Sequence, residues 1–358
     1  MMDRMDSYKQ YDELLVDGEQ YCGIASILTW VQKLEATNQS ENLLIARFIR
    51  DWFDDKAYIK LQTSGSTGQP KTIKVHKQSM VASAHRTIRF FNLQQGDSAL
   101  LCLSAKYIAG KMMLVRALVG GLDVVITNIN SNPLQQINRV IGFAAMVPMQ
   151  LHNILSNTPG KLQNIKQLIV GGGSVNPLLL DQLSGLTTEV WETYGMTETV
   201  SHIALRNLSN GDEMFKLLPG LVIDVDSRGC LKVLPSDINT DTLFTNDMVK
   251  LESSTQFRLL GRWDNVINTG GVKVIPELIE AKLKSVIKED FIISWKPDDI
   301  LGQRVVLVLE SDSQVGLDDM DLSMMSKYEQ PKEVVAVSCF PKTETGKIQR
   351  LKLRELLG

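Results

Sequence analysis

The chain has 358 residues, of which 44% are hydrophobic and 22% are charged, and its formal net charge is −3. This composition is typical of a globular protein with a sizeable core, and the length leaves room for two domains. Nucleic acids and anionic membranes need clustered Lys and Arg, and the sequence has no long basic run. We therefore expect neither as a partner.

The first residues and the cysteines favour the cytoplasm. The N-terminal stretch MMDRMDSYKQYDELL contains no apolar segment followed by a small-residue cleavage site, so we expect no signal peptide. No apolar stretch reaches membrane-spanning length. The cysteines at positions 22, 102, 230 and 339 form no CxxC pair, so a disulfide framework is not expected.

Apolar periodicity predicts the elements in chain order. Residues 10–58 carry apolar side chains at three- and four-residue spacing, which predicts helix. A strand at 58–63 leads into a Gly/Ser/Thr loop, and 76–93 again follows the helical pattern. From 98 to 195 strand-like runs alternate with helix-like segments, which is typical of βαβ units and a parallel sheet.

Beyond about residue 200 the pattern changes to short strands separated by polar turns, which predicts an antiparallel, barrel-like region. The last part of the chain has the pattern of a small α+β domain. The expected fold class is therefore α/β. A large N-terminal domain would hold a mostly parallel, helix-covered sheet and a small barrel-like β region, and a small α+β C-terminal domain would follow.

The loop that follows this predicted strand indicates a phosphate site. Glycines let backbone N–H groups approach an anion, and hydroxyls add donors. A nucleoside-triphosphate P-loop does not fit, because Gln69 and Pro70 separate the last glycine from the lysine. A solvated Gly/Ser linker is the alternative, but a mobile phosphate-covering loop better explains the Pro-Lys-Thr ending. The candidate residues are Thr63, Ser64, Gly65, Ser66, Thr67, Gly68 and Lys71.

This loop, TSGSTGQPK, resembles the phosphate loop of the adenylate-forming enzymes, which comprise acyl-CoA synthetases, peptide-synthetase adenylation domains and luciferases. Further segments resemble the family's motifs in the family's order. They are LIVGGGS (168–174), WETYGMTET (191–199), LFTNDM (243–248), GRWDNVINTGGVK (261–273) and PKTETGKI (341–348). The resemblance thus covers nearly the whole chain. It implies a large domain over 1–261 with a shortened first subdomain, a hinge at 262–265 and a mobile lid at 266–358.

The second and third segments would bind the adenine. The resemblance implies that Gly171, Gly172 and Gly173 lie along the base, where side chains would collide with it. From the residues alone, a strand-to-helix turn is the alternative. Tyr194 would stack on the adenine, and Gly195 would allow the turn that follows.

Three residues would carry the chemistry at the α-phosphate. Thr197 would donate a hydrogen bond to this phosphate, and Glu198 would hold Mg²⁺, which prefers carboxylate and phosphate oxygens. A helix-capping box is the alternative for TYGMTE. Lys347 matches the family's catalytic lysine, which stabilises the charge that develops when the substrate carboxylate attacks. In isolation its segment would be a solvated turn.

The resemblance also assigns the ribose and the hinge. Asp247 would accept hydrogen bonds from the ribose hydroxyls, with Asn246 where the family usually has a glycine. We expect a turn after a strand here, which Asn tolerates because it can adopt positive φ. Arg262 would reach the ribose or a phosphate, and Asp264 matches the hinge residue that absorbs the backbone rotation.

Two segments resemble those of the o-succinylbenzoate–CoA ligases of menaquinone biosynthesis, namely YGMTETVSHIALR (194–206) and SAKYIAGKMMLVRALVGG (104–121). O-succinylbenzoate keeps a second carboxylate after activation, so its pocket should offer a cation or several donors. The substrate candidates are Gly110, Arg116, Ser201 and His202, with Lys111 as a further cation. A solvent-reaching side chain is the alternative for Arg116, and a core histidine for His202.

The implied reaction has two halves. A carboxylate attacks ATP to give an acyl-adenylate and pyrophosphate, and the thiol of CoA then displaces AMP. The expected ligands are ATP, Mg²⁺, CoA and a small carboxylic acid, and a homodimer is left open. One alternative is a ligase or adenylating protein for another aromatic or aliphatic acid. Another, of a different class, is a non-catalytic nucleotide sensor or scaffold.

Overall fold

The computed structural model describes residues 8–62, 72–176, 179–284, 286–287, 289–312, 322–342 and 348–357. Contacts within the chain divide it into two compact units. The first comprises Met1–Val222 and Leu234–Leu243, and the second Ile223–Val233 and Phe244–Gly358. Residues 262–265 lie inside the second unit. Their role as a hinge between 1–261 and 266–358 stays a prediction.

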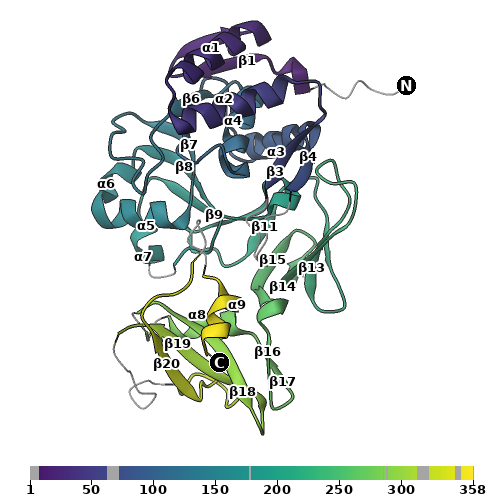
Figure 1. Cartoon of the computed structure of the whole chain (residues 1–358), viewed down its shortest axis with the longest axis vertical. Coiled ribbons are helices and arrows are strands. Elements are labelled where there is room, and N and C mark those ends of the chain that lie inside the picture. The colour runs from purple at the N-terminus through teal and green to yellow at the C-terminus, as the bar shows by residue number, and fades with distance from the viewer. Residues whose placement is uncertain are drawn as a thin grey trace. The chain divides into compact units, whose positions relative to one another are not determined.

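A mostly parallel sheet forms the centre of the first unit (Figure 1). Its strands lie in the order β11-β10-β9-β8-β7-β5-β6-β1-β2. All neighbours from β9 to β1 are parallel, whereas β2, β10 and β11 are antiparallel to their neighbours. The strands are β1 (Glu13–Val16), β2 (Glu19–Cys22), β5 (Ser98–Leu101), β6 (Asp123–Ile126), β7 (Ile141–Met146), β8 (Ile165–Val170), β9 (Glu189–Gly195), β10 (His202–Asn207) and β11 (Phe215–Leu217). The predicted α/β class is confirmed.

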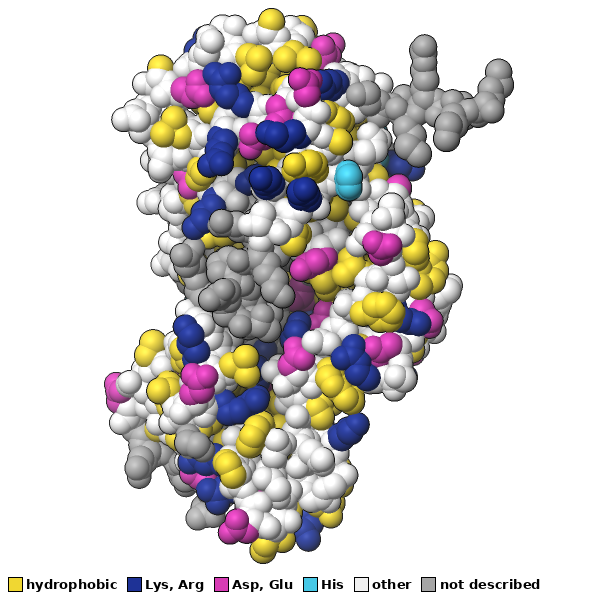
Figure 2. Space-filling view, turned by 45° about the vertical axis from the view of Figure 1, so that its right-hand side comes forward, with side chains coloured by type: hydrophobic (Ala, Val, Ile, Leu, Met, Phe, Trp, Pro, Cys, Tyr) yellow, Lys and Arg dark blue, Asp and Glu magenta, His cyan; other side chains and the backbone are white. Residues whose placement is uncertain are grey.

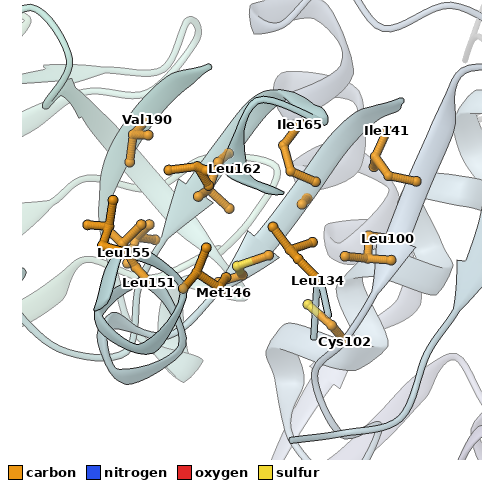
Figure 3. Packing of buried hydrophobic residues seen from close by; sticks show 14 of the residues in the cluster. Leu100, Cys102, Leu134, Ile141, Met146, Leu151, Leu155, Leu162, Ile165 and Val190 are labelled. Carbon is orange, nitrogen blue, oxygen red and sulfur yellow. The ribbon is translucent and has the colours of Figure 1, made fainter. Parts of the chain in front are cut away.

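Helices cover this sheet. They are α1 (Ile24–Ala36), α2 (Ser40–Phe53), α3 (Lys77–Phe90), α4 (Ile108–Gly120), α5 (Pro148–Asn157), α6 (Pro159–Leu162) and α7 (Leu180–Leu183), with 3₁₀ turns at η1 (Tyr8–Gln10) and η3 (Thr197–Thr199). Helix α3 packs along α4, which lies on β1, β5 and β6. Figure 3 shows Met146 of β7 beside Leu151 and Leu155 of α5, in one buried cluster. Each such side chain contributes about 1.5–3 kcal/mol by burial.

The predicted helix over 10–58 was wrong at its start. Residues Glu13–Val16 and Glu19–Cys22 form the antiparallel hairpin β1–β2. Its turn is Asp17-Gly18, with φ of 48° and 81°. Asp-Gly with both φ values positive suits a two-residue type I′ turn, the turn that matches the twist of a hairpin. The Asp17-Gly18 dipeptide is visible in the sequence, and its preference for a hairpin turn is stronger than the preference for helix that the apolar spacing around it indicates.

Lys77, the first residue of α3, is fully buried. A cation there faces the positive end of the helix dipole and needs a partner. Its Nζ donates to Asp54 Oδ1 at 2.8 Å and lies 4.7 Å from the centre of the Tyr8 ring. Burial alone would raise the pKa of Asp54, but hydrogen bonds from Lys77 and Lys56 outweigh it and lower the pKa to about 2. The ion pair ties the end of α2 to the start of α3.

Like charges face each other on the two-stranded sheet of β3 (Tyr58–Gln62) and β4 (Thr72–His76). The exposed Lys60 and Lys74 are cross-strand partners, and Lys74 Nζ lies 4.7 Å from the centre of the Tyr58 ring. Like charges in this position are destabilising. Figure 2 shows Lys and Arg side chains gathered on one face of the first unit. The fold thus produces a locally positive surface that no run in the sequence indicates.

The second unit combines an antiparallel sheet with a mixed α/β lobe. The sheet has the order β12-β13-β14-β15, and the lobe has β17-β16-β19-β18 with β20 beside β19. Alternate residues of β18 and β19 face opposite sides, so α8 packs with one buried cluster and α9 with the other. The elements are β12 (Ile223–Val225), β13 (Cys230–Val233), β14 (Leu243–Ser253), β15 (Gln256–Arg262), η4 (Trp263–Asn265), β16 (Ile267–Thr269), β17 (Val272–Val274), α8 (Pro276–Leu283), β18 (Phe291–Asp298), β19 (Gly302–Glu310), β20 (Glu333–Val337) and α9 (Arg350–Leu357).

Two further expectations concern cysteines and membrane spans. All four cysteines are free. Among the helices of the described ranges, none combines the length and the apolar character needed to cross a bilayer.

Candidate active site

Two predicted segments lie outside the described residues. They contain Thr63, Ser64, Gly65, Ser66, Thr67, Gly68 and Lys71 of the phosphate loop, and the catalytic candidate Lys347. Each of the two segments is flanked by residues whose backbones pair with each other. Gln62 of β3 is the partner of Thr72 of β4, and Lys342 forms a bridge with Ile348. The roles assigned to these residues stay predictions.

The three glycines after β8 differ in what the backbone requires. A Cβ on Gly171 would lie 2.2 Å from Thr193 Oγ1 of β9. Gly172 has φ +85°, in the left-handed region that favours glycine. A Cβ on Gly173 would lie 3.8 Å from Pro148 Cγ, an ordinary contact, with no closer neighbour among the described residues. The first two glycines thus have local reasons to be glycine, and contact with an adenine stays a prediction for all three.

A buried carboxylate fixes the end of this glycine segment. Glu192 of β9 is 3% exposed and accepts a hydrogen bond from the Val175 N–H at 3.1 Å. Arg206 of β10 donates to its other oxygen at 2.5 Å. The sequence analysis missed both residues. The signal was a charged residue between Val190 and Tyr194, at the alternate positions of β9 that face the core.

Tyr194 and Gly195 end β9. The Tyr194 ring is 7% exposed and packs against Phe215 of β11, with ring centroids 5.9 Å apart. A Cβ on Gly195 would lie 2.4 Å from the carbonyl oxygen of Ser201 and 2.6 Å from His202 Cα. Only glycine therefore allows β10 to begin this close to β9. Stacking of Tyr194 on adenine stays a prediction.

Replacing Gly195 with Ala is expected to lower the free energy of unfolding by about 1–3 kcal/mol, the usual effect of an overpacked site. The obstacle is backbone, so Ser201 and His202 must shift. Urea denaturation measures the change. Gly160→Ala is the matched control, because a Cβ there would meet no described residue within 4 Å. Equal midpoints for Gly195→Ala and the unsubstituted protein would contradict the close approach.

A strained turn separates the two halves of the TYGMTETVSH segment. Val200 has φ 67° and ψ −52°, and the Ser201 N–H donates to the Thr199 carbonyl at 2.7 Å. This is a γ-turn, which is rare, and a β-branched residue at positive φ adds strain of about 1–3 kcal/mol. Thr199 Oγ1 stabilises the turn by accepting from Met196 N–H at 2.9 Å and donating to the Ser201 carbonyl at 2.7 Å. No local pattern in the sequence indicates this turn.

The turn leaves Thr197 and Glu198 on the outside. Glu198 is exposed and Thr197 half-buried. Within the described residues neither side chain has a recorded hydrogen bond or ion pair. Their roles as a phosphate donor and a Mg²⁺ ligand stay predictions.

On the other side of the turn, Ser201 and His202 meet Arg116 of α4. Arg116 Nη2 donates to Ser201 Oγ at 2.9 Å, and Ser201 Oγ lies 3.4 Å from His202 Nδ1. His202 Nε2 lies 3.2 Å from Thr87 Oγ1, which donates to the Ser83 carbonyl at 3.3 Å. Only one set of donors and acceptors satisfies this series of hydrogen bonds: the Ser201 hydroxyl donates to His202 Nδ1, and His202 Nε2–H donates to Thr87 Oγ1. The structure thus brings together three of the predicted substrate residues.

Arg116 is a buried cation without a carboxylate partner among the described residues. Its Nε is buried without a hydrogen-bond partner there, and its guanidinium lies 5.9 Å from the Phe143 ring. Burial lowers its pKa to about 10, so it stays charged at neutral pH. Burial, and then the charge of Arg116, lowers the pKa of His202 well below its usual value, which keeps it neutral. The solvent-reaching alternative for Arg116 is therefore wrong.

Gly110 and Lys111 lie near the start of α4. A Cβ on Gly110 would lie 2.3 Å from the Ser104 carbonyl oxygen, so the helix needs glycine there for packing. Lys111 Nζ donates to the carbonyls of Ala105 and Lys106. Its burial lowers its pKa to about 8. No recorded contact joins either residue to Arg116, and their roles toward a substrate stay predictions.

The ribose and hinge candidates lie together in the second unit. Arg262 Nη1 donates to Asp247 Oδ1 at 3.3 Å, and Nη2 donates to Asp264 Oδ2 at 2.6 Å. The expected turn was wrong. Asn246 and Asp247 lie inside β14, and Asn246 is not among the described residues with positive φ. Asn246 instead uses its side chain, whose Nδ2 donates to Asp264 Oδ1 at 2.8 Å.

The donor set in the described residues fits a nucleotide and Mg²⁺. No three His, Cys, Asp or Glu side chains gather in this part of the chain. Mg²⁺ in nucleotide sites usually keeps one or two carboxylates, with phosphates and waters completing its octahedron. The exposed Glu198 suits that arrangement. The role of Asp247 toward the ribose stays a prediction.

A family model described as AMP-binding enzyme matches residues 29–225. A probable 2-succinylbenzoate–CoA ligase of Mycobacterium tuberculosis is 27% identical over 342 residues, which cover 88% of each protein. The 2-succinylbenzoate–CoA ligase of a Listeria monocytogenes strain is 25% identical over 322 residues, which cover 82% of this chain and 69% of that protein.

Two solved structures are similar. An acyl-CoA synthetase (AMP-forming)/AMP-acid ligase II-like protein of Dyadobacter fermentans is 37% identical with a TM-score of 0.61, over 89% of this chain and 95% of that one. The o-succinylbenzoate–CoA synthetase of Bacillus subtilis, in complex with ATP and magnesium, is 22% identical with a TM-score of 0.72, over 82% of this chain and 69% of that one. The second likeness concerns the fold.

Proposed function

Because the chain belongs to the family of AMP-binding enzymes, we propose that it is an o-succinylbenzoate–CoA ligase of menaquinone biosynthesis. The family gives the general activity, an ATP-dependent acyl-CoA ligation through an adenylate, with Mg²⁺ and CoA. The identity of the acid is the specific part of the proposal. The cytoplasm as its location belongs to the same proposal.

The choice of acid rests on the buried guanidinium of Arg116. A buried guanidinium without a carboxylate partner is costly unless an anion completes it. O-succinylbenzoate carries a second carboxylate that activation leaves unchanged. Ser201 Oγ stands next to this cation and can donate to such a carboxylate by rotating its hydroxyl. The names of the Mycobacterium and Listeria relatives support the same acid.

The assigned residues divide the remaining work. Thr197 would donate a hydrogen bond to the α-phosphate, and Glu198 would hold Mg²⁺, which would supply charge neutralisation at the phosphates. Asp247 accepts from the ribose hydroxyls, and Tyr194 with glycines 171–173 surrounds the adenine. Lys347, with the loop from Thr63 to Lys71, stabilises the charge that develops as the acid attacks. Catalysis by positioning and charge of this kind needs no Ser-His-Asp set.

A ligase for another acid is the second candidate. The highest identity among the relatives described above, 37%, is to a protein whose name specifies no acid. If that name reflects a different substrate, the same fold and chemistry would serve it. Arg116 would then favour another dicarboxylic acid over an uncharged or purely apolar one.

Pyrophosphate release over a panel of acids tests the proposal. The panel is o-succinylbenzoate, benzoate, a fatty acid and several amino acids, each with ATP and Mg²⁺, with and without CoA. We expect release with o-succinylbenzoate and at most a small fraction of it with benzoate. Pyrophosphate release with another acid, and none with o-succinylbenzoate, would support the ligase activity but refute the proposed substrate. No release with any acid, while ATP binds, would favour the non-catalytic alternative.

A further inference from the structure

The segment η4, residues Trp263–Asn265, is held by a side-chain network that includes the hinge candidate Asp264. Both oxygens of Asp264 are occupied: Oδ1 accepts from Asn246 Nδ2 at 2.8 Å, and Oδ2 from Arg262 Nη2 at 2.6 Å. Asn246 lies on β14 and Arg262 ends β15. The carboxylate is therefore anchored to the strands that precede the segment.

Asn246 is itself held from behind. Its Oδ1 accepts from Arg228 Nη1 at 2.9 Å. Arg228 Nη2 also donates to the Thr245 carbonyl at 3.1 Å, and its Nε donates to Asp226 Oδ2 at 2.9 Å. This fixes the orientation of the Asn246 amide, because its oxygen must face the guanidinium and its nitrogen the carboxylate. The Asn246 amide bridges the Arg228 guanidinium and the Asp264 carboxylate. A glycine at position 246, which has no side chain, could not do this.

The other side of the segment is anchored to the lobe that follows. Asn265 Nδ2 donates to Glu277 Oε1 of α8 at 2.5 Å. The Trp263 ring lies 4.6 Å from Lys273 Nζ of β17 and 5.9 Å from the Arg228 guanidinium. Three consecutive side chains thus bind different neighbours. Rotation of the backbone within the segment must break some of these contacts.

We propose that Asn246 is a positioning residue that latches the segment Trp263–Asn265 through Asp264. The Arg262–Asp264 ion pair is 42% and 45% exposed, and exposed pairs contribute little and are screened by salt. The hydrogen bond from Asn246 to the same carboxylate is also exposed, but Arg228 holds its donor amide in place, so it adds a second, orientation-specific restraint. It sets how readily the chain turns at Asp264. The kinetic consequence rests on the proposed function, whereas the latch itself does not.

Hydrogen–deuterium exchange tests the latch without any substrate. In Asn246→Ala the backbone amides of the peptide covering residues 263–266 should exchange about five- to tenfold faster, as expected for loss of one hydrogen bond to a charged group. Asn246→Asp should exchange faster still, because its carboxylate repels Asp264. Lys250→Ala, an exposed position on the same strand, is the matched control and should match the unsubstituted protein. Unchanged exchange in Asn246→Ala would overturn the proposal.

Half-reaction kinetics then test its consequence. With o-succinylbenzoate, Asn246→Ala should leave the rate of adenylate formation within about twofold, because no reacting group is lost. The rate of thioester formation after the adenylate has formed should change by about tenfold, because the chain must turn between the two steps. An equal fall in both rates would indicate a merely structural role and overturn the positioning role. Absence of any adenylate in the unsubstituted protein would instead refute the proposed function, with the exchange result still standing.

Discussion

Replacing Arg116 with Met is expected to lower kcat/KM for o-succinylbenzoate by about a hundredfold, the effect typical of removing one partner of a buried, charge-assisted contact. Met fills a similar volume and leaves no buried charge, so the fold should tolerate the change. Steady-state pyrophosphate release over a range of acid concentrations measures it. The loss should fall mainly on KM, because the second carboxylate is bound equally before and during reaction.

Two controls separate binding from folding. Arg116→Lys keeps the charge but loses the planar fork that reaches Ser201, so an intermediate loss is expected. Any residual activity with benzoate, which lacks the second carboxylate, should be unaffected by Arg116→Met. An unchanged kcat/KM for o-succinylbenzoate in Arg116→Met would remove this residue from the substrate site.

Replacing Lys77 with Ala is expected to lower the free energy of unfolding by about 2–4 kcal/mol, because it removes a fully buried side chain whose ammonium pairs with the part-exposed Asp54. The substitution also leaves a cavity at a fully buried position. Urea denaturation measures the loss. Lys56→Ala removes the other, exposed partner of Asp54 and is the control, with an expected change within about 0.5 kcal/mol.

The Lys77–Asp54 pair also makes the free energy of unfolding depend on pH in the acid range. The pKa of Asp54 is lowered on folding to about 2, so its contribution is fully present above its unfolded pKa and disappears as pH falls from about 4 to about 2. The difference between the denaturation midpoints of the unsubstituted protein and Lys77→Ala should therefore narrow over that range, leaving the part that comes from the cavity. A difference that stays constant down to pH 2 would contradict this origin of the stability.

Local signals predicted much of the fold and the segments of the site. Alternating strand and helix patterns between 98 and 195 gave the parallel sheet, because burial on both sides imposes apolar runs. The segment WETYGMTET was recognisable because a ring, a glycine, a hydroxyl and a carboxylate occur within a few residues. Gly195 needs to be glycine for a reason that the sequence did not show, the close approach of β10.

What the sequence could not predict depends on contacts between distant residues. Arg116 and Ser201 are 85 positions apart, and only the sheet brings them together. The Lys77–Asp54 pair and the γ-turn at Val200 likewise depend on tertiary packing that overrides local preference. The Asn246–Asp264 hydrogen bond forms because β14 and β15 are neighbours in the sheet. The expected turn at Asn246 was wrong because this residue lies inside β14.

The most direct test of the central claim is mass spectrometry of the products made by the purified protein from ATP, Mg²⁺ and o-succinylbenzoate. We predict o-succinylbenzoyl-adenylate and pyrophosphate when CoA is absent, and o-succinylbenzoyl-CoA with AMP when CoA is added. Formation of ADP, or of neither the adenylate nor the thioester while the protein is folded and binds ATP, would contradict the account.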